Sequence, residues 1–278
     1  MNKIDEIYYD LCYKLFKHGN DVGGTKELNN VMIRLEDINE NIVSIRNISP
    51  AYLFGEWLWY FTGKNSTEFI SSFGSMWKKL SDDGHTNNSA YGYLMKYAFG
   101  FDQIETVIKL LTLHPDSRRA VINLNTPNKN VIDTKDEPCT IALQFLIRDG
   151  KLNCTAIMRS NDIWFGFPYD VAFFTELQKY IADKLMVDYG SYVHFVTSLH
   201  LYERNYKDIE NVVNNPVSRP IYFDRKKFHG NSYFLAELID VATKHCTPNV
   251  VKGLMINLAK DFFDFRQEEN TDENQYGR

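Results

Sequence analysis

Apolar and polar residues follow one another along the chain in two patterns, one typical of helices and one typical of strands. Residues 3–17 place apolar side chains at helical spacing. Ser49 and Pro50 predict the cap and first turn of an apolar helix that ends at Thr62, before Gly63. The other expected elements are helices at 102–113 and 169–187 and strands at 31–37, 42–47, 119–124, 140–147, 152–158, 192–201 and 251–257.

The order of these elements predicts an α+β fold, with helices around a mostly antiparallel or mixed β-sheet core. Asp149-Gly150 is a turn signal, so a hairpin is expected between the strands on either side of it. No internal repeat or low-complexity linker divides the chain, and residues 1–278 are therefore predicted to form a single domain. The polar, acidic segment 267–278 is expected to be a mobile tail.

Composition favours a globular protein that handles a small ligand. Of the 278 residues, 44% are hydrophobic, and the net charge of -5 disfavours a nucleic-acid polymer as partner. The four cysteines form no Cys-x-x-Cys pair, which fits a reducing cytosol. The first ten residues carry charges where a signal peptide needs an apolar core, and no apolar run reaches the ~18 residues that span a bilayer. We therefore expect a cytoplasmic protein with no membrane partner.

Candidate chemistry centres on Cys139, which follows Pro138 at the entry to an apolar strand. A free cysteine is most often a small core residue. The position at a strand edge and the arginines nearby favour a reactive thiolate instead, because cationic neighbours lower the pKa of a thiol. Cys154 lies in the middle of a strand and is expected to belong to the core.

Two pairs of polar residues could hold a phosphate. Arg159-Ser160 offers a guanidinium fork and a hydroxyl at a strand end. Arg118-Arg119 lies at a turn between a helix and a strand. Because neighbouring strand residues face opposite ways, at least one arginine of this second pair is as readily explained as a surface charge.

Three further polar residues stand in apolar surroundings. Glu56 lies in a hydrophobic helix, where burial would raise its pKa and suit it to transfer protons; an exposed charge on the outer face is the alternative. His200 and Tyr202 share one face of a strand and would suit a sugar hydroxyl, although a lone strand histidine is more often structural.

Several enzyme classes lack their motifs here. There is no His-x-Glu, no Cys-x-x-Cys and no His-Glu-x-x-His, so we expect no metal and find no support for a zinc nucleotide deaminase. The phosphate-binding loop of kinases and the glycine fingerprint of dinucleotide-binding proteins are missing from the sequence as well.

From about Thr25 to Asn205 the chain resembles the thymidylate synthase family, and within it the cytidylate 5-hydroxymethylases. Motifs in matching order and spacing carry the resemblance: Glu56, Trp77, Asn88–Gly92, Pro115–Arg119, Pro138–Thr140, Gln144-Phe145, Arg159–Asp170 and His200-x-Tyr202. The resemblance implies the α+β fold of that family and a homodimer formed through the sheet.

The resemblance also implies roles for these residues. Cys139 would add to C6 of a pyrimidine nucleoside monophosphate, after which C5 takes the one-carbon unit of 5,10-methylenetetrahydrofolate, with Glu56 and Tyr91 managing protons and ordered water. The nucleotide would be held by Arg159, Ser160, Gln144, Asp170, His200 and Tyr202, and by Arg118 and Arg119 of a partner subunit. The folate side would be lined by Trp77, Asp162, Gly166 and Tyr169.

Three departures from the synthase pattern favour hydroxymethylation of a cytidylate. Asp170 replaces the asparagine that reads uracil, and a carboxylate accepts a hydrogen bond from the amino group of cytosine but donates none to O4 of uracil. Thr140 replaces the histidine that usually follows the catalytic cysteine. The polar end, residues 273–278, resembles no apolar lid, so water could add to the exocyclic methylene.

We therefore expect an enzyme that converts a cytidylate, dCMP before CMP, to its 5-hydroxymethyl derivative and tetrahydrofolate. A methyltransferase that acts on dUMP or dCMP and releases dihydrofolate is a second hypothesis. A nucleotide-binding protein without catalysis is a third. The expected location is the cytoplasm, or the host cytoplasm if the protein is phage-encoded.

Overall fold

The computed structural model describes residues 1–125, 133–219 and 221–265. Its central sheet has the strand order β1-β2-β7-β5-β4-β3, and β6 pairs with β7 beside this path. β5 and β6 run parallel to β7, whereas the other neighbouring strands are antiparallel. These strands are β1 (Asn20–Val22), β2 (Thr25–Leu35), β3 (Val121–Asn123), β4 (Thr140–Arg148), β5 (Lys151–Met158), β6 (Asn161–Asp162) and β7 (Asp188–Tyr202). The predicted α+β fold with a mixed sheet is confirmed.

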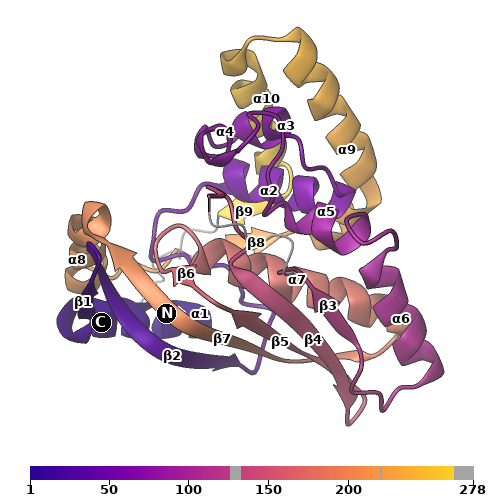
Figure 1. Cartoon of the computed structure of the whole chain (residues 1–278), viewed down its shortest axis with the longest axis horizontal. Coiled ribbons are helices and arrows are strands. Elements are labelled where there is room, and N and C mark those ends of the chain that lie inside the picture. Colours follow the sequence, from indigo (N-terminus) through magenta and orange to yellow (C-terminus); the bar gives the residue numbers. More distant parts are fainter. Residues whose placement is uncertain (126–132, 220, 266–278) are drawn as a thin grey trace, which may run out of the picture.

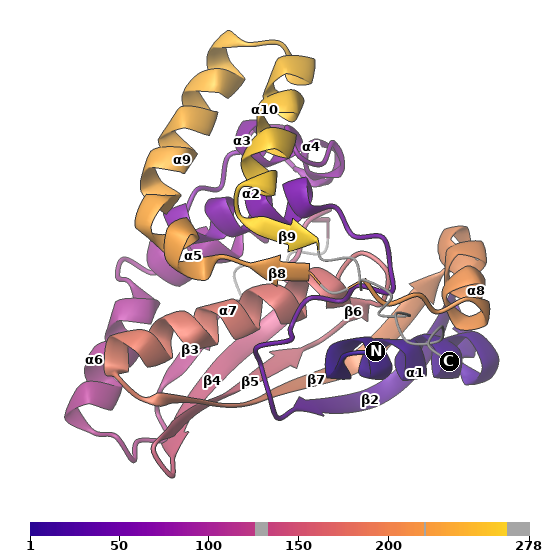
Figure 2. The same ribbon diagram turned by 180° about the vertical axis from the view of Figure 1, so that it is seen from behind.

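Helices cover one face of the sheet and build a second layer beside it. The long helix α7 and the N-terminal α1 lie against the same face, as Figure 2 shows from behind. α9 and α10 form a helical hairpin that projects from the sheet together with α2 (Figure 1). The helices are α1 (Lys3–His18), α2 (Pro50–Thr62), α3 (Thr67–Ser71), α4 (Met76–Leu80), α5 (Tyr91–Lys96), α6 (Gln103–Leu113), α7 (Phe167–Leu185), α8 (Tyr206–Asn214), α9 (Arg225–His245) and α10 (Pro248–Lys260), and a small sheet pairs β8 (Ile221–Phe223) with β9 (Phe263–Phe265).

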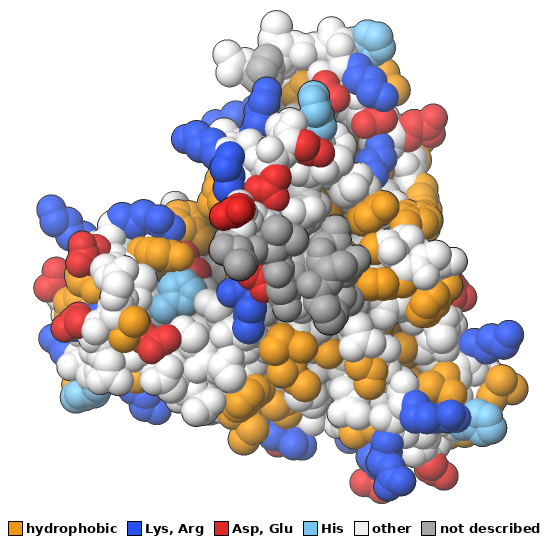
Figure 3. Space-filling view, viewed as in Figure 1, with side chains coloured by type: hydrophobic (Ala, Val, Ile, Leu, Met, Phe, Trp, Pro, Cys, Tyr) orange, Lys and Arg blue, Asp and Glu red, His pale blue; other side chains and the backbone are white. Residues whose placement is uncertain are grey.

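The opposite face of the central sheet is left uncovered by the described helices. Along β5, buried residues alternate with partly exposed ones, as expected when only one face is packed. A cross-strand row on the uncovered face consists of Met32, Phe195 and Ile157, which are register partners on β2, β7 and β5. Met32 is 68% exposed. Figure 3 shows apolar side chains gathered over this part of the sheet.

Local signals placed several elements correctly. The side chain of Ser49 accepts a hydrogen bond from the backbone N–H of Tyr52 at the start of α2. Gly63 ends that helix with φ 71°, in the left-handed region that glycine adopts without strain. Asp149 and Gly150, both with positive φ, form the predicted turn between β4 and β5.

Two predicted strands are wrong. The predicted strand 42–47 does not form, although residues 42–46 are buried, because the backbone N–H groups of Ser44 and Ile45 donate to Oδ1 of the buried Asp5, at 2.6 and 3.1 Å. Residues 251–257 lie inside α10, where Val251 and Met255 are buried at helical spacing. The apolar run in this second segment is thus the inner face of a helix.

The sequence also left helices unpredicted. α3, α4 and α5 are too short to show a periodic pattern, and α9 buries only a few positions along its 21 residues.

None of the helices in the described ranges is long and apolar enough to cross a membrane. The predicted mobile tail, 267–278, lies outside the described residues.

Candidate active site

Cys139 directly precedes β4, at the end of the sheet where β5 leads through β6 into α7. The backbone N–H of Arg159 donates to the carbonyl oxygen of Cys139 at 2.9 Å, which joins the two strand ends. The guanidinium of Arg159 turns back and donates to the carbonyl oxygens of Glu137 and Pro138, both at 3.0 Å. A cation is thereby held beside the segment that carries the thiol, directly before β4.

Burial raises the pKa of the Cys139 thiol to about 11. The charge of Arg159 opposes this shift, and the carboxyl group of Asp170 adds to it. The thiol is therefore neutral near pH 7 in the free protein, and its proton must leave when the sulfur attacks a substrate.

Asp170 lies in the first turn of α7 and belongs to the same group of side chains as Cys139. Burial raises its pKa to about 7, while a hydrogen bond of 2.7 Å from Nδ2 of Asn161 to Oδ2 lowers it. The charge of Asp170 also raises the pKa of Glu56 and of Tyr91. Because such effects weaken with distance, Cys139, Glu56 and Tyr91 each lie near Asp170, which stands at the centre of this group.

Glu56 is 5% exposed, so the alternative of an outer-face charge is wrong. Its Oε1 accepts a hydrogen bond of 2.8 Å from the hydroxyl of Tyr52, which in turn accepts one of 2.9 Å from Nε1 of Trp77. Burial raises the pKa of Glu56 to about 8. At neutral pH the carboxyl group carries a proton that it can release.

Tyr91 and Thr140 connect this centre to α5. The hydroxyl of Thr140 donates to the hydroxyl oxygen of Tyr91 at 3.0 Å, and both residues are buried. The Tyr91 ring stacks on Tyr60 of α2, with the centroids 5.4 Å apart. Thr140, the residue after Cys139, thus fixes the position of Tyr91 near Cys139 and Asp170.

Ser160, His200 and Tyr202 also meet at this end of the sheet. The Ser160 hydroxyl lies 3.2 Å from Nδ1 of His200. The rings of His200 and Tyr202 are edge to face, with the centroids 5.0 Å apart. Arg204, which the sequence did not single out, lies over Tyr202 and 3.9 Å from Asp162.

Arg118 and Arg119 do not join this group within one chain. Both are exposed at the turn between α6 and β3. The pairing of Val121 with Gln144 places Arg119 level with Leu146, towards the far end of β4 from Cys139. Gln144 lies midway along β4, and its amide donates to the carbonyl oxygen of Arg118 at 3.0 Å.

An aromatic wall with a buried cation lies beside Asp170. Tyr169 is edge to face with Tyr52, and its hydroxyl accepts a hydrogen bond from the backbone of Ser49. The guanidinium of Arg46 lies 4.5 Å from the ring centroid of Trp164 and 5.4 Å from that of Tyr169. Arg46 is 5% exposed, and its Nε and Nη1 have no hydrogen-bond partner among the described residues.

No sequence pattern singles out Arg46, because the apolar segment around it predicts an ordinary strand. Gly166 lies at the start of α7. A Cβ at this position would come within 2.5 Å of Nδ2 of Asn161, so the glycine leaves room for that amide.

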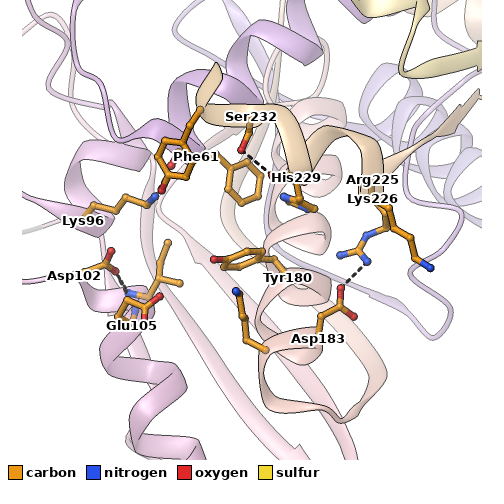
Figure 4. Close-up of a pocket in the computed structure, with 13 residues that line it drawn as sticks. Phe61, Lys96, Asp102, Glu105, Tyr180, Asp183, Arg225, Lys226, His229 and Ser232 are labelled. Carbon is orange, nitrogen blue, oxygen red and sulfur yellow. Dashed lines mark hydrogen bonds and ion pairs between the residues drawn. The ribbon is translucent and has the colours of Figure 1, made fainter. Parts of the chain in front are cut away.

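A cavity of about 480 Å³ lies elsewhere, between α7 and α9 (Figure 4). It shares no lining residue with the group around Cys139. Much of the charge in its wall is paired within the chain, as for Arg225, whose Nη1 lies 2.8 Å from Oδ2 of Asp183. Within the described ranges, no group of three histidine, cysteine, aspartate or glutamate side chains could hold a metal ion.

A family model described as thymidylate synthase matches residues 6–238, which is most of the chain. The chain belongs to the thymidylate synthase family. The predicted resemblance to this family is thereby confirmed, together with its α+β fold.

Two curated relatives within the thymidylate synthase family carry the name deoxyuridylate hydroxymethyltransferase. The protein from Bacillus phage SP01 is 30% identical over 224 residues, which cover 74% of this chain and 58% of the relative. The protein from Pseudomonas phage M6 is 32% identical over 161 residues, covering 57% and 46%. The chain thus spans about half the length of these relatives. Their names specify a uridylate rather than the cytidylate expected from Asp170.

Proposed function

We propose that this chain transfers the one-carbon unit of 5,10-methylenetetrahydrofolate to C5 of a cytidylate, where water adds to the exocyclic methylene, and that it releases the 5-hydroxymethyl nucleotide and tetrahydrofolate. The observation that carries the proposal is the position of Asp170, beside Cys139 and Glu56 in one group of ionisable side chains. A nucleophile, a proton carrier and a base-reading carboxyl group are the parts that this reaction needs.

The first step is addition of the Cys139 sulfur to C6 of the ring. The thiol proton leaves as the S–C6 bond forms, and the ring gains a proton at N3, which leaves C5 nucleophilic. Arg159 favours the thiolate, because its charge is the interaction that lowers the pKa of Cys139. Glu56, protonated near pH 7, supplies or removes protons at the ring substituents.

The surroundings of Arg46 fit a folate. Folates combine flat aromatic rings with a carboxylate-bearing tail, and the wall offers aromatic faces at Trp164 and Tyr169 with a guanidinium whose donors are unsatisfied. The bound folate supplies the one-carbon unit. Tyr169, Arg46, Trp77, Asp162 and Gly166 would position it against the nucleotide.

Base selection follows from the ionisation of Asp170. As a carboxylate it accepts hydrogen bonds from the amino group of cytosine and from a protonated N3. A pKa of about 7 leaves a substantial carboxylate fraction at neutral pH. The same value supports a uridylate as second candidate, because the protonated acid can donate to O4 and accept from N3–H, as an amide does. The names of the relatives favour that alternative.

A homodimer completes the proposed phosphate site. The uncovered sheet face with Met32, Phe195 and Ile157 is an apolar surface that a second copy would bury. Arg118 and Arg119 are exposed and distant from Cys139 of their own chain, so they could serve only the site of a partner subunit.

The test is to incubate the protein with dCMP, CMP or dUMP and methylenetetrahydrofolate and to identify the products by mass spectrometry. We expect a 5-hydroxymethyl cytidylate without dihydrofolate, and no product from the Cys139→Ser variant. Conversion of dUMP alone would establish the uridylate alternative. A methyl product with dihydrofolate would replace hydroxymethyl transfer by methylation.

A further inference from the structure

A continuous chain of buried hydrogen bonds runs from the sheet to Asp170. Nδ2 of Asn161 donates to Oδ2 of Asp170 at 2.7 Å, and Oδ1 of Asn161 lies 3.1 Å from Nε2 of His194. Nδ1 of His194 lies 2.7 Å from the hydroxyl of Tyr192. Asn161, His194 and Tyr192 are each at most 2% exposed. None of the three belongs to the residues assigned above to substrate or folate.

The direction of every hydrogen bond in this chain follows from the charge on Asp170. Burial lowers the pKa of His194 to about 3, so its ring is neutral and carries one N–H. An ionised Asp170 only accepts, which turns the amide nitrogen of Asn161 toward it and the amide oxygen toward His194. His194 then holds its proton on Nε2, and Nδ1 accepts the hydroxyl proton of Tyr192.

We propose that Asn161, oriented by His194, is a positioning residue that fixes Oδ2 of Asp170 and thereby keeps Oδ1 free for the base. The proposal rests on the base-reading role of Asp170 described above. Asn161 is the sole described residue that donates a hydrogen bond to this carboxyl group. Without that donor, both carboxyl oxygens would be free to rotate and to compete for the base.

The other groups around Asp170 supply no comparable donor. The ionisable side chains that interact with it come from α2, α5, the segment before β4, β6 and β7, and they are Glu56, Tyr60, Tyr91, Cys139, Asp162 and Tyr192. Asp162 opposes ionisation of Asp170, whereas the hydrogen bond from Asn161 supports it. The amide therefore offsets part of the cost of burying the charged form that selects cytosine.

Gly166 is an independent sign that the structure accommodates this amide. Any larger residue there would place its Cβ within 2.5 Å of Nδ2 of Asn161 and within 3.0 Å of the backbone oxygen of Asp162. The start of α7 thus leaves space for the amide at the point where it reaches Asp170. Gly166 thus makes room for the proposed positioning residue, whichever ligand atoms lie beside it.

The experiment removes the donor and follows both ionisation and selectivity. Asn161→Leu deletes the amide, His194→Leu deletes the group that orients it, and His194→Gln restores an N–H donor. Gln178→Leu is the matched control, because Gln178 is an equally buried amide on α7 that donates to backbone oxygens and does not contact Asp170. The readouts are the Asp170 titration, by NMR with ¹³C-labelled aspartate, and the ratio of kcat/KM for dCMP to that for dUMP.

We expect Asn161→Leu to raise the titration midpoint of Asp170 and to lower the dCMP preference roughly tenfold, as loss of a hydrogen bond to a charged group would. His194→Leu should act in the same direction, and His194→Gln should restore much of the wild-type behaviour. An unmoved midpoint in folded Asn161→Leu overturns the proposal, as does an equal shift in Gln178→Leu. The titration of Asp170 can be measured in the absence of catalytic turnover. If the wild type converts neither nucleotide, the proposed function fails while the positioning role is still decided.

Discussion

The hydroxyl of Tyr52 donates to Oε1 of Glu56 at 2.8 Å, one helical turn further along α2. Because the Tyr52 hydroxyl donates its single proton to Glu56, its oxygen accepts the hydrogen bond from Nε1 of Trp77. The arrangement holds Glu56 in one orientation toward the centre that contains Cys139 and Asp170.

Replacing Glu56 by glutamine keeps an acceptor for Tyr52 and removes the exchangeable proton. We expect kcat to fall by about 10²- to 10⁴-fold, with a much smaller change in the KM for the nucleotide. Steady-state kinetics with dCMP measure both parameters. Tyr52→Phe, which perturbs the orientation alone, should lose less. Wild-type kcat in Glu56→Gln would show that no essential proton passes through this carboxyl group.

The same variant should change the pH dependence of stability. Burial raises the pKa of Glu56 from 4.5 to about 8, so between these values the folded protein keeps a proton that the unfolded chain releases. The contribution of this group to stability is therefore present below about pH 4.5 and is lost as the pH rises through about 8. Glu56→Gln should be more stable than the wild type near pH 8 by on the order of 2–4 kcal/mol, and nearly equal near pH 4.5. Urea unfolding at the two pH values measures the difference; a constant difference would contradict the assignment.

Cys139 should react slowly with alkylating reagents at neutral pH, because burial raises the pKa of its thiol to about 11. The rate should increase through the alkaline range toward that value. Replacing Arg159 by methionine should slow the reaction further, since the guanidinium lowers the pKa of the thiol. Mass spectrometry of a Cys246→Ser background, which removes the exposed cysteine, isolates the signal. Rapid alkylation at pH 7 would refute the neutral thiol.

Asp170→Asn should shift preference from the cytidylate toward the uridylate. The amide donates to O4 and accepts from N3–H at any pH, whereas the carboxylate donates nothing. The ratio of kcat/KM for the two nucleotides measures the change, and we expect a shift of roughly tenfold or more. Unaltered selectivity would mean that Asp170 does not read the base.

The proposed homodimer makes a prediction about mixed subunits. A double variant with Arg118 and Arg119 changed to alanine and a Cys139→Ser variant should each be inactive alone. Refolding them together should restore about a quarter of the wild-type activity, because half of the dimers are hybrids with one intact site. Activity that stays at the level of the separate variants would exclude a phosphate site shared between subunits. Phe195→Glu, on the uncovered face, should weaken the dimer in analytical ultracentrifugation.

Much of the local structure could be predicted from neighbouring residues alone. Ser49 and Gly63 bound α2 because a cap and a left-handed terminus are local events. Asp149-Gly150 formed its turn for the same reason. Residues 42–46 could not be placed, because the carboxylate of Asp5 that takes their backbone hydrogen bonds lies far away in the chain.

The sequence by itself determined the family, the strand that follows Cys139 and the turn between β4 and β5, since each depends on residue types at fixed spacing. Only the tertiary structure decided that Glu56 is buried, that Arg46 lies on aromatic rings and that Asn161 connects His194 to Asp170. The physical reason is that burial and hydrogen-bond partners depend on distances through space. Spacing along the chain does not encode which distant side chain buries a carboxyl group or donates a hydrogen bond to it.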